Sequence, residues 1–522
     1  MALQLGNRRI CGNGGPLPAR AAHRSHRADG RFTMHDTHVQ PDVESFYSLP
    51  GVDLSATRCC GTACFVARQR DPDGWREASS QSPRIHCLGK CYAAPAIATD
   101  GSRPTIEVRS RTGIVLERIA RGGARTLDEY RQNGGLTALK AALALKPEQV
   151  VDELELSELK GRGGGGFPTG TKWRVAAAQA LPEKYVVANL DEGDPGAYVD
   201  RLIAEDDPFC LIEGMAIAAH AVGATRGWIY VRGEYPYATR SLNSAIETAR
   251  ADGLLGTRVL GTSFAFDVDV AVGGGSYVCG EETALLNSIE GKRPVARVRP
   301  PYVAERGLWG KPTLVNNVET IANVPWILRH GGRAYAALGV PGSRGTKVVS
   351  LNSLFRRPGL YEIEFGIPVR EIVEGIGGGL QSGTLRGLMI GGPLTGVVPP
   401  DQLDTRFGFQ ELHAIGASVG HGGIIVFDEH TSIAELVHHV FSFGAYESCG
   451  NCTPCRLGAP RIEEIFRRIV AGQPARSPDE IEWRQIVGAL KLASLCGLGT
   501  GLAEFAESIT RHYASELQQC FA

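Results

Sequence analysis

Strands and helices alternate between residues 184 and 272, and this alternation limits the possible folds more than any other feature of the sequence. The expected strands are 185–190, 227–231 and 264–272, and the expected helices are about 208–222 and 236–252. Such alternation favours a mostly parallel sheet in an α/β domain. Because ligands of these sheets bind beyond the carboxyl ends of the strands, we predict a binding site at that edge.

Two polar loops follow strands at the same edge. Residues 189–196 read Asn-Leu-Asp-Glu-Gly-Asp-Pro-Gly, and residues 273–282 read Gly-Gly-Gly-Ser-Tyr-Val-Cys-Gly-Glu-Glu. Carboxylates repel a phosphate but can bind hydroxyl groups or ring nitrogens, so ribose, ribityl or amide contacts are the expected roles. A solvated acidic turn would explain either loop alone, whereas two such loops together favour a binding site.

A glycine-rich stretch covers residues 161–173, where five of the first six residues are glycine. Without Cβ atoms, its backbone N–H groups can approach a ligand closely and adopt positive φ. Arg162 and Lys172 can bind phosphate oxygens, and Phe167 offers a flat apolar face. Residues 124–160 are expected to form two helices, so the stretch does not follow a strand as a dinucleotide fingerprint does. We predict a phosphate-binding loop of another kind, followed by a helix over about 172–180; a flexible surface loop is the alternative.

The 13 cysteines are clustered at short gaps, which suits metal binding better than a disulfide framework. Three of them form a C-x2-C-x2-C motif, and a fourth is remote. Three close thiolates can cap one face of a [4Fe–4S] cluster while a distant one completes it, and zinc on the same thiolates is the alternative. The expected ligands are Cys449, Cys452, Cys455 and Cys496. Arg456 is predicted to offset part of their charge.

A second group comprises Cys59, Cys64, Cys87 and Cys91. Four thiolates from two loops can hold zinc or a [2Fe–2S] cluster. The four- and three-residue gaps differ from the two-residue gap of zinc knuckles and favour iron–sulfur. Structural zinc and unliganded thiols are the alternatives.

Composition excludes several functions. The formal net charge is −1, so no overall attraction to nucleic acid or to an anionic membrane is expected. No apolar run approaches the ~18 residues of a membrane span, and Glu213 and His220 interrupt the best candidate, 209–224. We expect a cytoplasmic location, either free or peripheral to the membrane through a complex. Residues 1–40 are expected to be disordered, with translation starting at Met1 or Met34.

Five motifs jointly resemble the FMN- and NADH-binding subunit of complex I, the NADH:quinone oxidoreductase. The same module occurs in diaphorase subunits of NAD-reducing hydrogenases and in beta subunits of NAD-dependent formate dehydrogenases. The motifs are Gly161–Trp173, Asn189–Gly196, Tyr277–Leu285, Lys311–Thr320 and Glu447–Arg456. The N-terminal cysteines, with Cys-Leu-Gly-x-Cys-x-x-Ala-Pro, are similar to a thioredoxin-like [2Fe–2S] domain. Only 22 residues separate Cys64 from Cys87, so a trimmed version is expected.

The resemblance implies an α/β protein built around a Rossmann-like FMN-binding domain. It adds an N-terminal thioredoxin-like domain, a β-grasp (ubiquitin-like) domain and a C-terminal helical bundle that carries an iron–sulfur cluster. The expected boundaries are 1–40 for the extension, 41–120 for the thioredoxin-like [2Fe–2S] domain, 121–335 for the FMN/NADH domain, 336–425 for the β-grasp domain and 426–522 for the helical [4Fe–4S] domain.

The same resemblance implies the site residues. The FMN-binding residues would be Gly161, Arg162, Gly163, Gly164, Lys172, Asn189, Asp191, Glu192, Tyr277, Gly280, Glu281, Asn316, Asn317 and Thr320. The NADH-binding residues would be Phe167, Asp194, Tyr277, Glu282, Arg299 and Tyr302. Gly165 and Asp194 stand where the family usually has alanine and glutamate, so we expect tuning without loss of function.

The function implied is an FMN-dependent NADH dehydrogenase or diaphorase. Hydride would pass between NADH and FMN with no protein nucleophile or acid–base residue. Single electrons would then pass through the [4Fe–4S] and [2Fe–2S] clusters to iron–sulfur subunits of a complex I, formate dehydrogenase or hydrogenase assembly. Acidic Glu282 favours NAD over NADP. The alternative is a structural subunit with zinc in both cysteine sites and no flavin.

Overall fold

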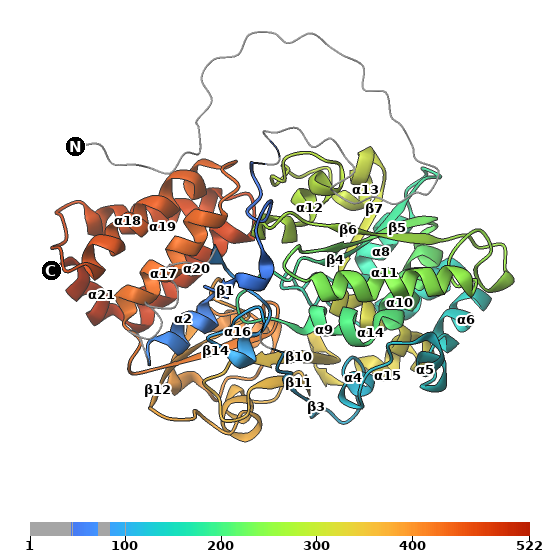
Figure 1. Cartoon of the computed structure of the whole chain (residues 1–522), viewed down its shortest axis with the longest axis horizontal. Helices are drawn as coiled ribbons and strands as arrows, with labels where there is room; N and C mark the ends of the chain where they lie inside the picture. The colour runs from blue at the N-terminus through green and yellow to red at the C-terminus, as the bar shows by residue number, and fades with distance from the viewer. Residues whose placement is uncertain (1–42, 44, 71–83, 100) are drawn as a thin grey trace, which may run out of the picture.

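The computed structural model describes residues 43, 45–70, 84–99 and 101–522, so the expected extension 1–40 and the choice of start codon lie outside it. Two larger sheets with their covering helices, two small two-stranded sheets and a C-terminal group of helices make up the described chain (Figure 1). None of the described helices has both the length and the apolar character needed to cross a membrane.

The first sheet contains four parallel strands in the order β6-β5-β4-β7. Its strands are β4 (Tyr185–Leu190), β5 (Arg226–Val231), β6 (Asp267–Val272) and β7 (Thr313–Asn317). The predicted parallel α/β sheet is therefore confirmed. Strand β6 starts later than predicted because Phe266 pairs with Gly256 in an isolated antiparallel bridge.

Helices connect these strands and cover the sheet. They include α9 (Val199–Asp206), α10 (Pro208–Val222), α11 (Pro236–Ala251), α12 (Glu282–Ile289), α13 (Val303–Arg306), α14 (Val318–His330) and α15 (Gly332–Ala336). Glu213, which interrupts the apolar run of α10, accepts from the backbone N–H groups of Leu136 (3.1 Å) and Leu139 (2.8 Å). The buried carboxylate thus satisfies amides at the start of helix α6 (Thr137–Ala144).

The segment before the glycine loop holds more helices than predicted. After the short α4 (Glu117–Ala120) come α5 (Leu127–Gln132), α6 (Thr137–Ala144) and α7 (Pro147–Leu156), where two helices were expected. Breaks at Gly134-Gly135 and at Lys146-Pro147 divide the segment, because glycine and proline end helices. After the loop, α8 (Thr169–Ala177) begins earlier than the predicted residue 172.

The second sheet has six strands in the order β13-β12-β14-β10-β11-β3. They are β3 (Thr105–Val108), β10 (Thr346–Leu351), β11 (Gly359–Glu364), β12 (Leu385–Ile390), β13 (Val397–Val398) and β14 (Gly423–Asp428). A π-helix, Glu371–Ile376, lies between β11 and β12, and α16 (Phe409–Ala414) precedes β14. β3 comes from before residue 120 and pairs with β11, so this sheet crosses an expected domain boundary; the boundaries themselves stay predictions.

The described N-terminal unit is small, with β1 (Arg58–Cys59) parallel to β2 (Arg84–Ile85) and one α-helix, α2 (Thr62–Arg68). It rests on the C-terminal helices, where the Phe65 ring stacks on His439 with centroids 4.3 Å apart. Those helices, orange to red in Figure 1, are α17 (Ile433–Glu447), α18 (Ala459–Val470), α19 (Asp479–Ala493), α20 (Gly497–His512) and α21 (Ala514–Phe521).

Candidate functional site

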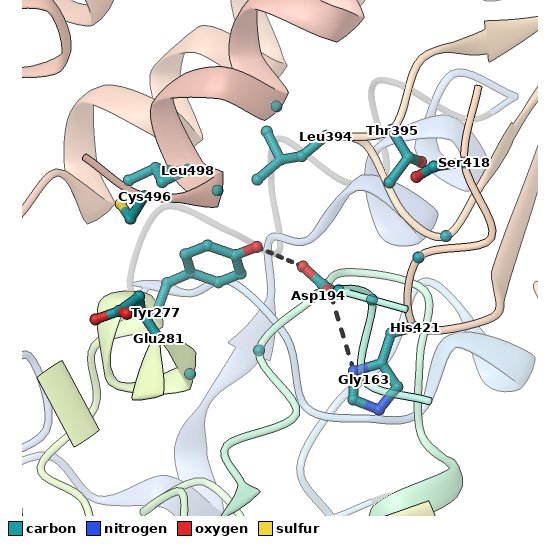
Figure 2. Close-up of a pocket in the computed structure, with 18 of the residues that line it drawn as sticks. Gly163, Asp194, Tyr277, Glu281, Leu394, Thr395, Ser418, His421, Cys496 and Leu498 are labelled. Carbon is teal, nitrogen blue, oxygen red and sulfur yellow. Dashed lines mark hydrogen bonds and ion pairs between the residues drawn. The ribbon is translucent and has the colours of Figure 1, made fainter. Parts of the chain in front are cut away.

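A cavity of about 550 Å³ lies at the predicted edge of the parallel sheet (Figure 2). The glycine loop and the two polar loops form part of its wall. The rest comes from turns of the six-stranded sheet and from the first turns of α20. Its main lining segments are 163–165, 189–194, 277–281, 391–395, 418–421 and 496–501.

The structure brings many of the predicted ligand-binding residues to this cavity. Those that line it are Gly163, Gly164, Asn189, Asp191, Asp194, Tyr277, Gly280, Glu281 and Asn317. Those outside its lining are Gly161, Arg162, Phe167, Lys172, Glu192, Glu282, Arg299, Tyr302, Asn316 and Thr320. The second group includes buried residues and residues that are charged or exposed.

The glycine loop is closed on itself and pressed against α14. The Gly161 N–H donates to the Phe167 carbonyl over 2.9 Å, and Gly164 adopts φ +111°. A Cβ on Gly163 would lie 2.8 Å from Cβ of Asn317, which is closer than side-chain carbons pack. The Asn317 side chain in turn caps α14 by accepting from the Thr320 N–H (3.1 Å).

The Arg162 side chain corrects one expectation. It is buried beneath the loop, where its guanidinium donates to the carbonyl of Lys160 (2.9 Å), the hydroxyl of Tyr335 (2.8 Å) and the carbonyl of Arg344 (2.8 Å). It also lies 4.8 Å from the centroid of the Phe365 ring. The side chain therefore does not form the expected fork onto a phosphate, because it is buried and its Nη1 and Nη2 atoms donate to these protein groups; its Nε has no partner among the described residues. The side chain braces the loop instead.

Charged residues and exposed aromatic residues make up part of the group outside the lining. Lys172 Nζ lies 2.7 Å from a carboxylate oxygen of Glu282, and Arg299 pairs with both Glu281 and Glu282. Phe167 and Tyr302 expose 56% and 55% of their surface, far more than aromatic residues with only a packing role. Exposed rings of this kind can stack on a planar ligand.

Three predicted residues form a layer behind the wall. Asn316 accepts from the indole N–H of Trp173 (2.9 Å), and Thr320 Oγ1 accepts from the backbone N–H of Arg162 (2.8 Å). Glu192 accepts from two backbone N–H groups in the first turn of α9 (both 3.0 Å). All three side chains are buried and hold the wall in place.

Asp191 provides a test of whether the cavity fits a ligand. Its Oδ2 is buried and, among the described residues, finds no hydrogen-bond partner. Burial raises the pKa of this carboxyl well above its usual range. A buried acceptor without a donor is costly, and a ligand N–H or hydroxyl would satisfy it. Nearby, Asn189 Nδ2 donates to the Gly280 carbonyl (2.8 Å), which ties the two polar loops together.

His421 is a cavity residue that sequence reasoning missed. It is buried, and its Nε2 lies 2.7 Å from Asp200 Oδ2. Its ring faces Asp194, which accepts a 2.5 Å hydrogen bond from the Tyr277 hydroxyl across the cavity (Figure 2). The short glycine run 420–423 around this histidine is a signal that could have indicated a second binding loop.

The four C-terminal cysteines lie close enough to act on one another electrostatically, and their role as cluster ligands stays a prediction. Cys449, Cys452 and Cys455 lie between α17 and α18, and Cys496 directly precedes α20. Burial raises the pKa of Cys455 to about 12, and the charges of the other three thiols act on it. Burial likewise raises the pKa of Cys496 to about 11, and the N–H groups of Leu498 and Gly499 in the first turn of α20 oppose that shift. Four converging thiols of this kind suit a cluster.

The N-terminal cysteines also converge. Cys59, Cys64, Cys87 and Cys91 are all buried, and they interact as two pairs, 59 with 64 and 87 with 91. Backbone N–H groups of Gly61, Gly89 and Ala96 point at Cys59, Cys87 and Cys64 at distances of 3.3 to 3.4 Å. Amide donors to sulfur are typical of iron–sulfur sites.

Comparison with known proteins identifies the same two regions. A family model described as "Nuo51 FMN-binding domain" matches residues 154–326, and one described as "NADH-ubiquinone oxidoreductase-F iron-sulfur binding region" matches residues 435–520. The first match contains the glycine loop and both polar loops. The second contains the four C-terminal cysteines.

Whole-chain comparisons agree. The chain is 41% identical over 394 residues to NADP-reducing hydrogenase subunit HndC of Solidesulfovibrio fructosivorans, covering 75% of this chain and 80% of that protein. It is 39% identical over 399 residues to an NADH-quinone oxidoreductase subunit of Escherichia coli, covering 75% and 89%. A crystal structure of an NAD⁺-reducing [NiFe]-hydrogenase in the H2-reduced state matches with a TM-score of 0.77 and 29% identity, over 92% of this chain and 87% of that chain.

These matches establish FMN and a [4Fe–4S] cluster as cofactors and NADH oxidation with electron transfer as the function. The chain belongs to the NADH-quinone oxidoreductase-F family, which includes subunits of complex I and of NAD-reducing hydrogenases.

Proposed function

We propose that the cavity binds FMN against the glycine loop, with NADH entering from the side of Phe167 and Tyr302. The close packing of Gly163 on Asn317 and the unsatisfied Asp191 support this placement. The backbone of the loop would hold the phosphate end. Asn189, Asp191 and Gly280, at the carboxyl edge of the sheet, would bind the ribityl and ring groups.

When bound, FMN supplies a ring that accepts a hydride from NADH and releases the two electrons singly. The protein's own contribution is positioning and charge. Phe167 and Tyr302 would stack on the dinucleotide, and Glu282, neutralised by Lys172, would accept from its ribose hydroxyls. Asp194 and Tyr277 would orient the nicotinamide. No nucleophile or acid–base residue is needed.

One observation supports electron transfer from the flavin to the [4Fe–4S] cluster. Cys496 lines the same cavity as the glycine loop and also belongs to the proposed [4Fe–4S] ligand set. Figure 2 shows its sulfur beside Tyr277, and Cys496 acts electrostatically on that tyrosine. A single wall would therefore separate the flavin from the cluster, which favours direct passage of single electrons.

The N-terminal unit would hold a [2Fe–2S] cluster in a trimmed thioredoxin-like fold. The burial of all four cysteines and their paired arrangement support this. The six-stranded sheet would be the β-grasp domain, since its central strands β10 and β14 run parallel and each has an antiparallel neighbour. The proposed boundaries remain those near residues 120, 335 and 425.

The electrons would leave to iron–sulfur subunits of a larger assembly, of the complex I, hydrogenase or formate dehydrogenase type. Relatives named as NADH-quinone oxidoreductase and as NADP-reducing hydrogenase subunits support the first two. We propose NAD as the nucleotide, because Glu282 would accept a hydrogen bond from the free 2′-hydroxyl of NAD, which NADP lacks. The location would be cytoplasmic, or peripheral to the membrane through the complex.

Cys452→Ser tests the division of roles between flavin and cluster. The variant should keep wild-type NADH–ferricyanide activity, because ferricyanide takes electrons from the flavin, and lose transfer to the partner subunits. Cys520→Ser, a cysteine outside both clusters, is the control and should retain both activities. Equal loss of both activities in Cys452→Ser would overturn the assignment, and zinc with no flavin in the wild type would favour the structural alternative.

A further inference from the structure

His421 occupies an unusual place in the cavity wall, because three carboxylates surround it. Its Nε2 lies 2.7 Å from Asp200 Oδ2 and 3.6 Å from Glu192 Oε1, and its Nδ1 lies 3.9 Å from Asp194 Oδ2. Asp200 and Glu192 are fully buried. Buried carboxylates need a compensating charge, and the imidazole is placed to supply one.

The hydrogen bonds of Asp200 determine which ring nitrogen of His421 carries the first proton. Asp200 Oδ2 also accepts from Asn317 Nδ2 (2.5 Å), and its Oδ1 accepts from the backbone N–H of Glu319 (3.1 Å). Surrounded by donors, this carboxylate is an acceptor, so His421 Nε2 donates to it. Any second proton then resides on Nδ1, the nitrogen nearer to Asp194 and the cavity.

The other charged groups near His421 form a pair of their own. Lys347 and Glu319 are fully buried and joined in an ion pair, and Lys347 Nζ also donates to the His421 carbonyl (3.1 Å). Lys347 therefore neutralises Glu319 and holds the histidine loop. The negative charges of Asp200 and Glu192 are therefore left for the His421 side chain to balance.

We propose that Asp200 and Glu192 hold His421 as an imidazolium that presents its positive charge to the flavin ring and favours reduced over oxidised flavin. This inference rests on the proposed FMN site. His421 Nε2 lies beside Asp200 and Asn317, on the side of the glycine loop, whereas Nδ1 faces the Asp194–Tyr277 hydrogen bond between the two polar loops. The proton on Nδ1 is therefore directed to the ring end of the flavin and not to its phosphate end. Two-electron reduction gives the flavin ring a negative charge near neutrality, and a fixed cation stabilises charge that develops in a closed site.

The acid–base properties agree with this role. Burial alone lowers the pKa of His421, but the charge and hydrogen bond of Asp200 and the charge of Glu192 raise it to about 9, against a smaller opposing effect of Lys347. Burial and Asp200 raise the pKa of Glu192 to about 7. The imidazolium is thus present at neutral pH and is lost as the pH rises through about 9.

The test is the midpoint potential of bound FMN, measured by spectroelectrochemistry on the full chain. His421→Gln keeps a side-chain N–H for Asp200 but removes the charge. We expect its preference for reduced over oxidised FMN to fall about tenfold, which is about 30 mV for a two-electron couple. His421→Lys, which restores a cation, should recover most of the loss. The control is His438→Gln, which breaks a histidine–carboxylate pair with Glu463 (3.2 Å) outside the cavity lining and should leave the potential unchanged.

Each outcome decides the proposal. An unchanged midpoint potential in FMN-loaded His421→Gln would overturn the proposal. A selective loss of FMN binding, with riboflavin binding and the potential unchanged, would also overturn it, because the charge of His421 would then face the phosphate. If His421→Gln retains no flavin, the wild-type protein provides the test. The midpoint potential of its bound FMN should show an extra pH-dependent change near pH 9, and a pH profile without that change would contradict the proposed role of His421. Wild-type protein without flavin would instead defeat the proposed FMN site.

Discussion

Replacing Gly163 with alanine tests whether the glycine loop forms the flavin site. The added methyl group would lie 2.8 Å from Cβ and 3.1 Å from Cγ of Asn317. Overpacking of this kind costs about 1–3 kcal/mol. Asn317 cannot move away freely, because it caps α14 and donates to Asp200. The strain therefore displaces part of the cavity wall, and at about 1.4 kcal/mol per tenfold FMN affinity should fall by about 5- to 150-fold.

The assay is a titration of flavin-free protein with FMN, followed by flavin fluorescence. Gly165→Ala is the matched control in the same loop, since a Cβ there meets no heavy atom of the described chain within 4 Å. It should bind FMN with nearly wild-type affinity. Melting temperatures of both variants separate weaker binding from unfolding. Equal affinities for Gly163→Ala and Gly165→Ala, with both proteins folded, would refute the packing argument.

Three further substitutions probe the supports of the site. Arg162→Lys should weaken FMN and riboflavin binding equally, because the side chain braces the loop and does not meet the phosphate; a selective loss of FMN binding would contradict this. Lys172→Ala removes the ion pair that joins Lys172 to Glu282 over 2.7 Å and should lower the FMN content of purified protein. Full flavin retention would argue against the placement of Lys172 at the FMN site. Lys347→Met breaks a fully buried ion pair and should destabilise the protein by about 3–5 kcal/mol, seen as a lower melting temperature. Adding Glu319→Gln should restore part of the melting temperature lost in Lys347→Met. No recovery would contradict the uncompensated charge of Glu319 as the cause.

Local sequence signals were sufficient for the central sheet and its helices. Helix α10 has the predicted bounds because Pro208 occupies its first turn and Gly223 ends it with φ +78°. The C-terminal cysteine motif was also sufficient by itself, since its two-residue gaps keep three thiols close together in the chain. The prediction of two helices before the glycine loop was wrong because glycine at Gly134-Gly135 and proline at position 147 divide that segment further.

Long-range partners account for what the sequence could not predict. The direction of Arg162 depends on Tyr335 and Arg344, which lie 173 and 182 residues away. The role of His421 depends on Asp200, which is 221 residues away. In both cases the residue type indicates that a polar partner exists, but only the fold decides whether that partner is a ligand or another part of the protein.

The most direct test of the central claim is an anaerobic NADH titration of the purified full chain, with FMN, iron and zinc measured on the same sample. The account predicts one FMN per chain, iron for at least one [4Fe–4S] cluster, and flavin and iron–sulfur absorbance that NADH bleaches. A colourless protein that contains zinc and does not respond to NADH would contradict it.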